Sequence, residues 1–178
     1  MKKVLIISSS PRRDGNSESL AKEFMRGAQA AGHQCELVHL NDLKLNYCQA
    51  CYACTKTGKC FQNDGMNELA EKAAHCDVLV LATPVYFYTM SGQLKVFIDR
   101  LVPVYTKIHA KIYILATAWD PNTTNLELTA ESIRGCTRDC FENCTEGGVI
   151  LAGDVGDKGD INKFPKILKQ AFEMGKDC

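Results

Sequence analysis

The 178-residue sequence has no excess of charge of either sign, because its 21 Lys and Arg residues equal its 21 Asp and Glu residues. Nucleic acids and anionic membranes attract strongly basic surfaces, so this balance argues against both as partners. Long apolar runs are also missing. The short run after Met1 is too brief for a signal-peptide core or a membrane span, and we therefore expect a soluble, cytoplasmic protein.

Two nucleotide-binding motifs are absent as well. The pattern G-x-x-x-x-G-K-[ST] of ATPases does not occur, and neither does the G-x-G-x-x-G of ordinary dinucleotide-binding domains. Asp154, Asp157 and Asp160 do not meet the EF-hand pattern, so they predict a turn rather than a calcium loop. Because the chain also lacks internal repeats, we expect one domain over residues 1–178 with a full core.

Apolar runs rich in β-branched residues alternate with amphipathic segments five times along the chain. This alternation is typical of an α/β fold with a doubly wound sheet of five parallel strands, and we expect the strand order 2-1-3-4-5. In that order the loops after the first, third and fourth strands meet at one edge. The expected strands are 4–8, 35–38, 78–82, 111–117 and 148–152, and the expected helices begin near Ser17, Asp64 and Ser91, span 126–144, and include Phe164.

The first of these loops, residues 9–17, has the chemistry of a phosphate site. It is rich in hydroxyl and amide donors, Gly15 allows a tight bend, and the following helix points its free N–H groups and positive dipole end at the same place. Arg12 can add a cation. The alternative is a solvated turn with a serine helix cap.

The other two loops carry aromatic side chains. Residues 83–90 form a polar and aromatic loop, and Trp119, the sole tryptophan, follows the fourth expected strand. Each aromatic residue taken singly is better explained by packing at a strand end. Together with the phosphate loop they suit a ligand with a phosphate tail and a flat aromatic head, and FMN fits that description.

Four of the ten cysteines crowd into one long connection, which we define as the cysteine loop, residues 44–63. Their spacing is Cys48-x-x-Cys51-x-x-Cys54 and then Cys60 after five residues. Four thiolates in such a loop can hold a [4Fe–4S] cluster. Zinc or redox-active thiols are an alternative, although zinc sites usually separate two cysteine pairs by a longer stretch. Cysteines without any metal are the third possibility.

Three further cysteines recur at helical spacing. Cys136, Cys140 and Cys144 follow one another at intervals of four residues, which places them on one stripe of the expected helix. Free cysteine is among the most buried residue types. We therefore expect these three in the core or at an interface, with metal binding as the minor alternative.

Several of these motifs together resemble a known family. The sequence is similar to the flavodoxin-like NADPH-dependent FMN reductases, and more narrowly to their iron–sulfur flavoprotein branch. Ser9 stands where the family motif often has glycine, and Gly65 where it often has a second aspartate. The similarity is carried by Ser10-Pro11-Arg12 with Asn16-Ser17, by the four cysteines followed by Asp64 and Met66, and by Thr83-Pro84-Val85-Tyr86-Phe87 continuing into residues 95–100.

The resemblance implies a set of binding residues and no catalytic side chain, because the chemistry belongs to FMN. It implies that Ser10, Arg12, Asn16 and Ser17 surround the phosphate, that Pro84, Val85, Tyr86 and Phe87 hold the ribityl chain and ring, and that Ala118 and Trp119 close the third side. It also implies that Cys48, Cys51, Cys54 and Cys60 bind a [4Fe–4S] cluster.

These implications predict an FMN-dependent NAD(P)H oxidoreductase that passes electrons from a nicotinamide donor to an acceptor, as a homodimer or tetramer. One rival hypothesis is a flavodoxin-type electron carrier without NAD(P)H activity of its own, although the balanced charge argues against the charged docking face of a carrier. Another is a non-catalytic, metal-dependent module in which the cysteine loop only builds a subunit contact.

Overall fold

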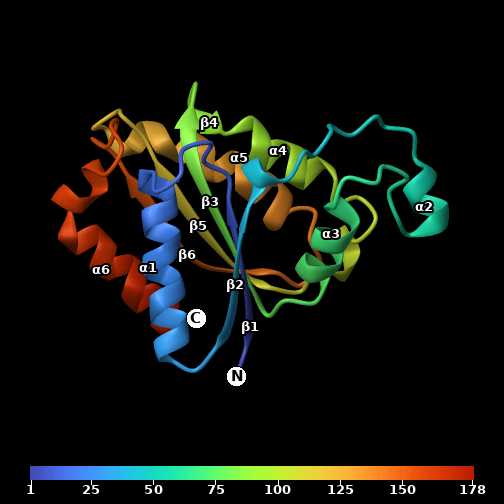
Figure 1. Cartoon of the computed structure of the whole chain (residues 1–178), viewed down its shortest axis with the longest axis horizontal. Coiled ribbons are helices and arrows are strands. Elements are labelled where there is room, and N and C mark those ends of the chain that lie inside the picture. The colour runs from blue at the N-terminus through green and yellow to red at the C-terminus, as the bar shows by residue number, and fades with distance from the viewer.

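The computed structural model describes all of residues 1–178 and shows a sheet between two layers of helices (Figure 1). Five parallel strands lie in the order β2-β1-β3-β5-β6, and β4 pairs antiparallel with β3. The predicted fold class and strand order are thus confirmed. The strands are β1 Lys3–Ser8, β2 Gln34–His39, β3 Val78–Tyr86, β4 Thr89–Met90, β5 Lys111–Thr117 and β6 Thr145–Ala152.

The sheet is buried on both faces, as parallel sheets are. Leu5 and Ile7 point into a core shared with helices α3, α4 and α5, whereas Val4 and Ile6 point into a second core under α1 and α6. None of the helices is both long and apolar enough to cross a lipid bilayer. The helices are α1 Asn16–Ala30, α2 Ala53–Thr57, α3 Met66–Ala74, α4 Gly92–Asp99, α5 Glu127–Thr137 and α6 Pro165–Lys176.

Helices α1 and α6 pack unusually closely, and two glycines make this possible. A Cβ atom on Gly27 would lie 1.9 Å from the carbonyl oxygen of Phe172, and one on Gly175 would lie 2.0 Å from that of Phe24. Both distances are far below a van der Waals contact. The two helix backbones therefore touch where each carries a glycine.

The start of α4 is the one predicted from the sequence, whereas the start of α3 differs slightly from the prediction. Ser91 caps α4 as predicted, because its Oγ accepts a hydrogen bond from the N–H of Leu94 at 3.4 Å. The helix expected to begin near Asp64 has Gly65 as its N-cap residue, and the Asp64 carboxylate accepts from the N–H of Met66 at 3.3 Å while pairing with Arg100.

The expected helix over 126–144 is wrong in extent, because α5 ends at Thr137. The N–H groups of Cys140 and Phe141 both bond to the carbonyl of Cys136, which turns the chain off the helix axis and buries Phe141. The predicted cysteine stripe is broken by this turn. Cys140 is exposed, while Cys136 and Cys144 pack partly against the core.

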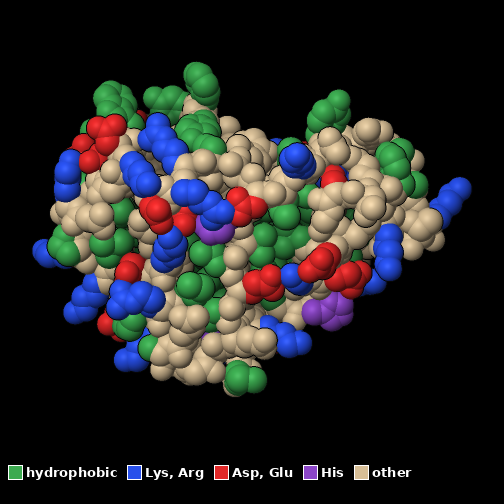
Figure 2. All heavy atoms as spheres, in the orientation of Figure 1, with side chains coloured by type: hydrophobic (Ala, Val, Ile, Leu, Met, Phe, Trp, Pro, Cys, Tyr) green, Lys and Arg blue, Asp and Glu red, His purple; other side chains and the backbone are tan.

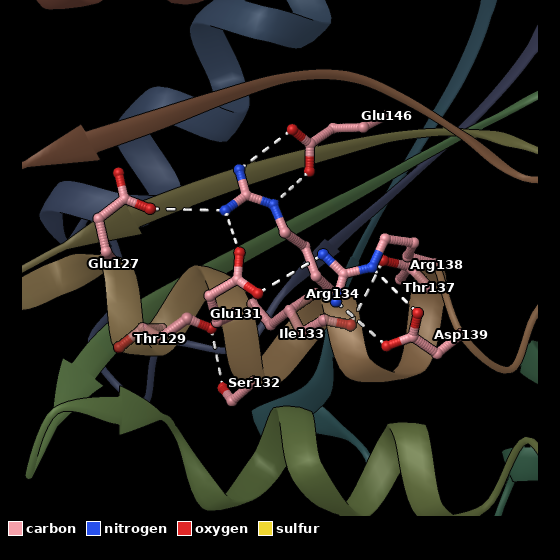
Figure 3. A network of polar contacts seen from close by, with 10 residues as sticks. All are labelled: Glu127, Thr129, Glu131, Ser132, Ile133, Arg134, Thr137, Arg138, Asp139 and Glu146. Atoms are coloured by element: carbon pink, nitrogen blue, oxygen red, sulfur yellow. Dashed lines mark hydrogen bonds and ion pairs between the residues drawn. The ribbon is translucent and has the colours of Figure 1, made fainter.

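The outer face of α5 carries a network of charges that reaches the edge strand β6 (Figure 3). Arg134 donates to Glu146 on β6 at 2.6 Å and to Glu131 one turn earlier at 2.7 Å. Charged side chains along an edge strand hinder its pairing with another chain. On the face drawn in Figure 2, Lys and Arg side chains are mixed with Asp and Glu side chains, in agreement with the zero net charge.

The segment predicted as a loop over 83–90 is a β-hairpin. β3 continues through Pro84, which is in register with Thr117 of β5, to Tyr86. The chain then reverses at Phe87 and Tyr88, with φ angles of 49° and 63°. Apolar side chains project above the tip of this hairpin (Figure 2), and Phe87 is 99% exposed.

Candidate functional site

A cavity lies at the carboxyl ends of β1, β3 and β5, where the strand order predicts a ligand site. It brings together every residue proposed from the sequence for FMN except Phe87, whose side chain lies outside it. Two cationic side chains and no carboxylate face the cavity, which suits an anionic ligand. The lining residues are Ser10, Arg12, Gly15, Asn16, Ser17, Pro84, Val85, Tyr86, Thr117, Ala118, Trp119, Val155, Gly156 and Lys158.

One end of the cavity is formed by the start of α1. Gly15 is the N-cap residue and offers no side-chain hydrogen bond, so the first N–H groups of the helix are free to meet a ligand. The Ser17 hydroxyl is buried and has no hydrogen-bond partner in the chain. A buried hydroxyl without a partner is costly. A phosphate group fits this end because its oxygens can accept from both.

The turn that precedes α1 is compact and internally bonded. Ser10 Oγ accepts a hydrogen bond from the N–H of Arg12 at 3.1 Å. A Cβ atom on Gly15 would lie 3.0 Å from the carbonyl oxygen of Arg12 and 3.1 Å from Ser10 Oγ. The backbone therefore approaches the cavity in a way that a larger residue would disturb.

Asn16 lines the cavity, but its side chain is engaged elsewhere. Its amide nitrogen donates to the carbonyls of Val155 and Asp157, at 3.0 and 2.9 Å. Its amide oxygen accepts from the N–H groups of Gly159 and Ile161, at 3.1 and 3.2 Å. Asn16 therefore fastens the segment after β6, and only its main chain is left to meet a ligand.

That segment, residues 153–158, is a fourth wall that the sequence reasoning missed. Arg12 holds it as well, by donating to the carbonyl of Gly156 at 3.0 Å. Gly156 in turn leaves room for Trp119, since a Cβ there would lie 2.5 Å from the indole Cδ1. Lys158 adds a cation. The available signal was the end of the last parallel strand, which meets the same edge of the sheet as the other three loops.

Ser9, which stands where the family motif often has glycine, has a structural role behind the cavity. The Ser9 hydroxyl donates to the carbonyl of Ala82 on β3 at 3.0 Å. It also lies 2.9 Å from the hydroxyl of Ser91, which donates to it from the start of α4. Both serines are fully buried. The loop of residues 9–17 is therefore joined to β3 and to α4 by side-chain hydroxyls.

The opposite end of the cavity is apolar and aromatic. Pro84, Val85 and Tyr86 approach it from the end of β3, and Ala118 and Trp119 from the end of β5. Trp119 is 80% exposed, so its ring stands at the mouth of the cavity rather than in the core. A flat ring can stack between such walls.

The cysteine loop, which contains α2, extends away from the sheet (Figure 1). Cys48 and Cys51 are exposed, and Cys54 and Cys60 are half-buried. No three or more His, Cys, Asp or Glu side chains converge in a way that could hold a metal ion. The four-cysteine ligand set is therefore not preassembled, although its thiols are the donors that an iron–sulfur cluster needs, and the cluster stays a prediction.

Comparison with known proteins gives the cavity a context. Residues 2–123 match a family model described as NADPH-dependent FMN reductase. An iron–sulfur flavoprotein of Archaeoglobus fulgidus is 37% identical over 101 residues, which are 57% of this chain and 46% of the relative. One of Methanocaldococcus jannaschii is 38% identical over 102 residues, which are 57% of this chain and 53% of the relative. The chain thus spans about half the length of these curated relatives.

Solved structures share the fold along the whole chain. An NAD(P)H:quinone oxidoreductase from Methanothermobacter marburgensis superposes with a TM-score of 0.77 at 19% identity, covering 99% of this chain and 96% of that one. An azoreductase from Bacillus anthracis gives 0.71 at 17% identity, with both chains covered completely. At such identities the likeness shows the fold alone.

Proposed function

The chain belongs to the NADPH-dependent FMN reductase family, and from this premise we propose that residues 1–178 form one FMN-binding domain that takes electrons from NAD(P)H and passes them to an acceptor. The observation that carries the proposal is the unpartnered, buried Ser17 hydroxyl at the open start of α1, opposite a pair of aromatic walls. One end suits a phosphate and the other a flat ring, as FMN requires.

Each end of the cavity has its own residues in this proposal. The Ser17 hydroxyl, the main chain of Asn16 and the guanidinium of Arg12 meet the phosphate, and Lys158 adds to the positive field. Ser10 lies beside the phosphate, with its hydroxyl donating to the carbonyl of Arg12 in its own turn. Pro84, Val85, Tyr86, Ala118 and Trp119 hold the ribityl chain and ring. Phe87 stays a predicted contact, made from the hairpin tip beside the cavity.

Bound FMN supplies the hydride and electron chemistry of this proposal. The side chains of the chain then bind and orient: no carboxylate or histidine faces the cavity, and the exposed Trp119 and Tyr86 leave its mouth open to a nicotinamide ring. Hydride transfer depends on distance and stacking rather than on a proton donor, so no catalytic side chain is needed.

Anaerobic stopped-flow absorbance of the FMN-loaded chain with NADPH and with NADH tests the activity. We expect at least one nucleotide to bleach the flavin absorbance. A chain that binds FMN but is bleached by neither nucleotide is instead an electron carrier. A chain that stays colourless after FMN is added contradicts the flavin site itself.

We also propose that Cys48, Cys51, Cys54 and Cys60 bind a [4Fe–4S] cluster. The four-thiol spacing supports this, as do the relatives named iron–sulfur flavoproteins. Because the thiols do not converge in the free chain, binding has to draw the loop together. Iron, sulfide and zinc content per chain after anaerobic preparation separates the cluster from zinc and from unmetalled thiols.

We infer that the working form is a homodimer or tetramer. The exposed aromatic side chains of Phe87, Tyr88 and Trp119 at the rim of the cavity support this, because a second copy could cover them. Light scattering after size-exclusion chromatography gives the mass directly, and a monomer at micromolar concentration would contradict the inference.

A further inference from the structure

The two ends of the cysteine loop meet at one buried guanidinium. Arg100 follows the last residue of α4 and is 2% exposed. It donates to both carboxylate oxygens of Asp64, at 2.8 and 3.0 Å, and to the carbonyl of Asn46 at 2.6 Å. Asp64 accepts in turn from the N–H of Asn46 at 3.0 Å. One ion pair therefore ties residue 46 to residue 64 and holds both against α4.

The pair is ionised in the folded chain. Burial opposes the charge on Asp64, but the hydrogen bonds from Arg100, Asn46 and Met66 outweigh it and lower the pKa of the carboxyl. The hydrogen bond with Asp64 raises the pKa of Arg100. A bidentate pair of this kind has one geometry only, so it fixes the positions of the groups it joins.

Cys60 is the cysteine of the loop whose main chain is bonded to a helix outside the loop. Its N–H donates to the side-chain oxygen of Asn67 on α3 at 2.8 Å, and its carbonyl accepts from the Asn67 amide nitrogen at 2.8 Å. Asp64 is the main cause of the raised pKa of Arg100, and Cys60 is a smaller one, so the sulfur lies within interaction range of the guanidinium. Of the other three cysteines, two are exposed and the third lies in the five-residue α2.

One hydrogen-bond donor of Arg100 has no partner. Its Nε is buried and has no hydrogen-bond partner in the chain, although Nη1 and Nη2 both donate hydrogen bonds. A buried charged donor without a partner is rare in a folded protein. The neighbouring thiol of Cys60 is a sulfur that could accept from it, and hydrogen bonds to sulfur are a known means of fixing and tuning metal-bound cysteines.

We propose that Arg100 is the positioning residue of the cysteine loop. With Asp64 it closes the loop at its base, and it presents Cys60 as the fixed thiol onto which the arm of residues 48–54 closes when a [4Fe–4S] cluster binds. The movement of residues 48–54 toward Cys60 rests on the proposed cluster. The Arg100–Asp64 pair at the base of the loop is present without it.

Hydrogen exchange of the full chain tests the base of the loop. The double variant D64N/R100Q removes both charges at once, so neither is left buried alone. We expect the amides of Asn46 and Cys60 to exchange at least about tenfold faster in it than in the wild type, while those of residues 79–81 in β3 stay protected. Unchanged exchange at both amides, with β3 still protected, would overturn the proposal.

Two further variants test whether faster exchange of the loop amides is specific to the loss of the Arg100–Asp64 pair. Lys95→Gln breaks the exposed Lys95–Asp99 pair on the same helix and should leave the exchange of the loop unchanged. If D64N/R100Q loses protection in β3 as well, Arg100→Lys takes its place. A lysine keeps the charge but lacks the planar fork that bridges Asp64 and Asn46, so the Asn46 amide should still exchange faster. Wild-type exchange at Asn46 in this variant contradicts the role.

Anaerobic reconstitution with ferrous iron and sulfide tests the closing of the arm. We expect about four iron atoms per wild-type chain, the same in Lys95→Gln, and less than about half of that in D64N/R100Q. Equal iron in the double variant and the wild type contradicts the positioning role. No iron in the wild type refutes the cluster and with it the closing of the arm, while the exchange result still decides the base.

Discussion

Ser17 is a buried hydroxyl without a protein partner, which few residues of a folded chain are. Replacing it with alanine removes the cost of burying that hydroxyl, so we expect apo Ser17→Ala to be at least as stable as the wild type. In the proposed FMN complex, the same change removes a donor to the phosphate. Because a hydrogen bond to a charged group contributes about 1.5–3 kcal/mol, the Kd for FMN should rise by roughly ten- to a hundredfold.

Fluorescence titration with FMN and thermal unfolding of the apo chain measure the two effects of Ser17→Ala. Ser19→Ala is the matched control, since that hydroxyl donates to the carbonyl of Gly15 and does not face the cavity. Its FMN affinity should stay within about twofold of the wild type. Equal losses of affinity in both variants would mean that the start of α1 was disturbed generally and that Ser17 makes no direct contact.

The lowered pKa of Asp64 predicts how stability depends on pH. Its carboxyl ionises more readily in the folded chain than in the unfolded one, so its contribution is present above the ordinary pKa of about 4 and is lost as the pH falls through the lower, folded value. We expect the gap in unfolding free energy between the wild type and D64N/R100Q to narrow below about pH 4. Urea unfolding between pH 7 and pH 3 measures this, and a constant gap would contradict it.

At the scale of elements, the glycine contact between α1 and α6 sets the tilt of α1 and thereby the direction of its N-terminus. Gly27→Ala forces the helices apart, because its Cβ would meet a backbone oxygen. Overpacking of this kind costs about 1–3 kcal/mol. We expect a Tm lower by roughly 3–10 °C and weaker FMN binding, since the N–H groups of α1 move with the helix.

Gly135→Ala provides the contrast to Gly27→Ala. Gly135 lies within α5 and has open space where a Cβ would point. The same chemical change should therefore stabilise the chain, by about 0.4–1 kcal/mol, through the reduced freedom of the unfolded state. Thermal unfolding of the two variants should give shifts of opposite sign, and shifts of one sign would refute the packing argument.

At the scale of the whole molecule, alternating apolar runs were enough to predict the sheet, its strand order and the edge where the loops meet. These features follow from local periodicity and from the handedness of crossovers, which any single sequence displays. The start of α4 was predictable for the same reason, because a serine cap is a local signal. The family resemblance added which residues line the cavity.

The parts that escaped prediction are contacts between distant segments. Nothing near Asn16 in the sequence indicates that its amide holds the segment after β6, and nothing near Asp64 points to Arg100, which lies 36 residues away. The end of α5 was missed because the burial of Phe141 overrides the helical spacing of the cysteines. Tertiary packing decided each of these, and local pattern did not.

Helix α4 has a further consequence. Its cap, Ser91, touches the loop at the phosphate end of the cavity, and Arg100 at its other end holds the cysteine loop. Its eight residues span roughly 12 Å at 1.5 Å per residue. Helix α4 thus fixes the distance between the cavity and the base of the cysteine loop, and a change in that distance would break a buried hydrogen bond.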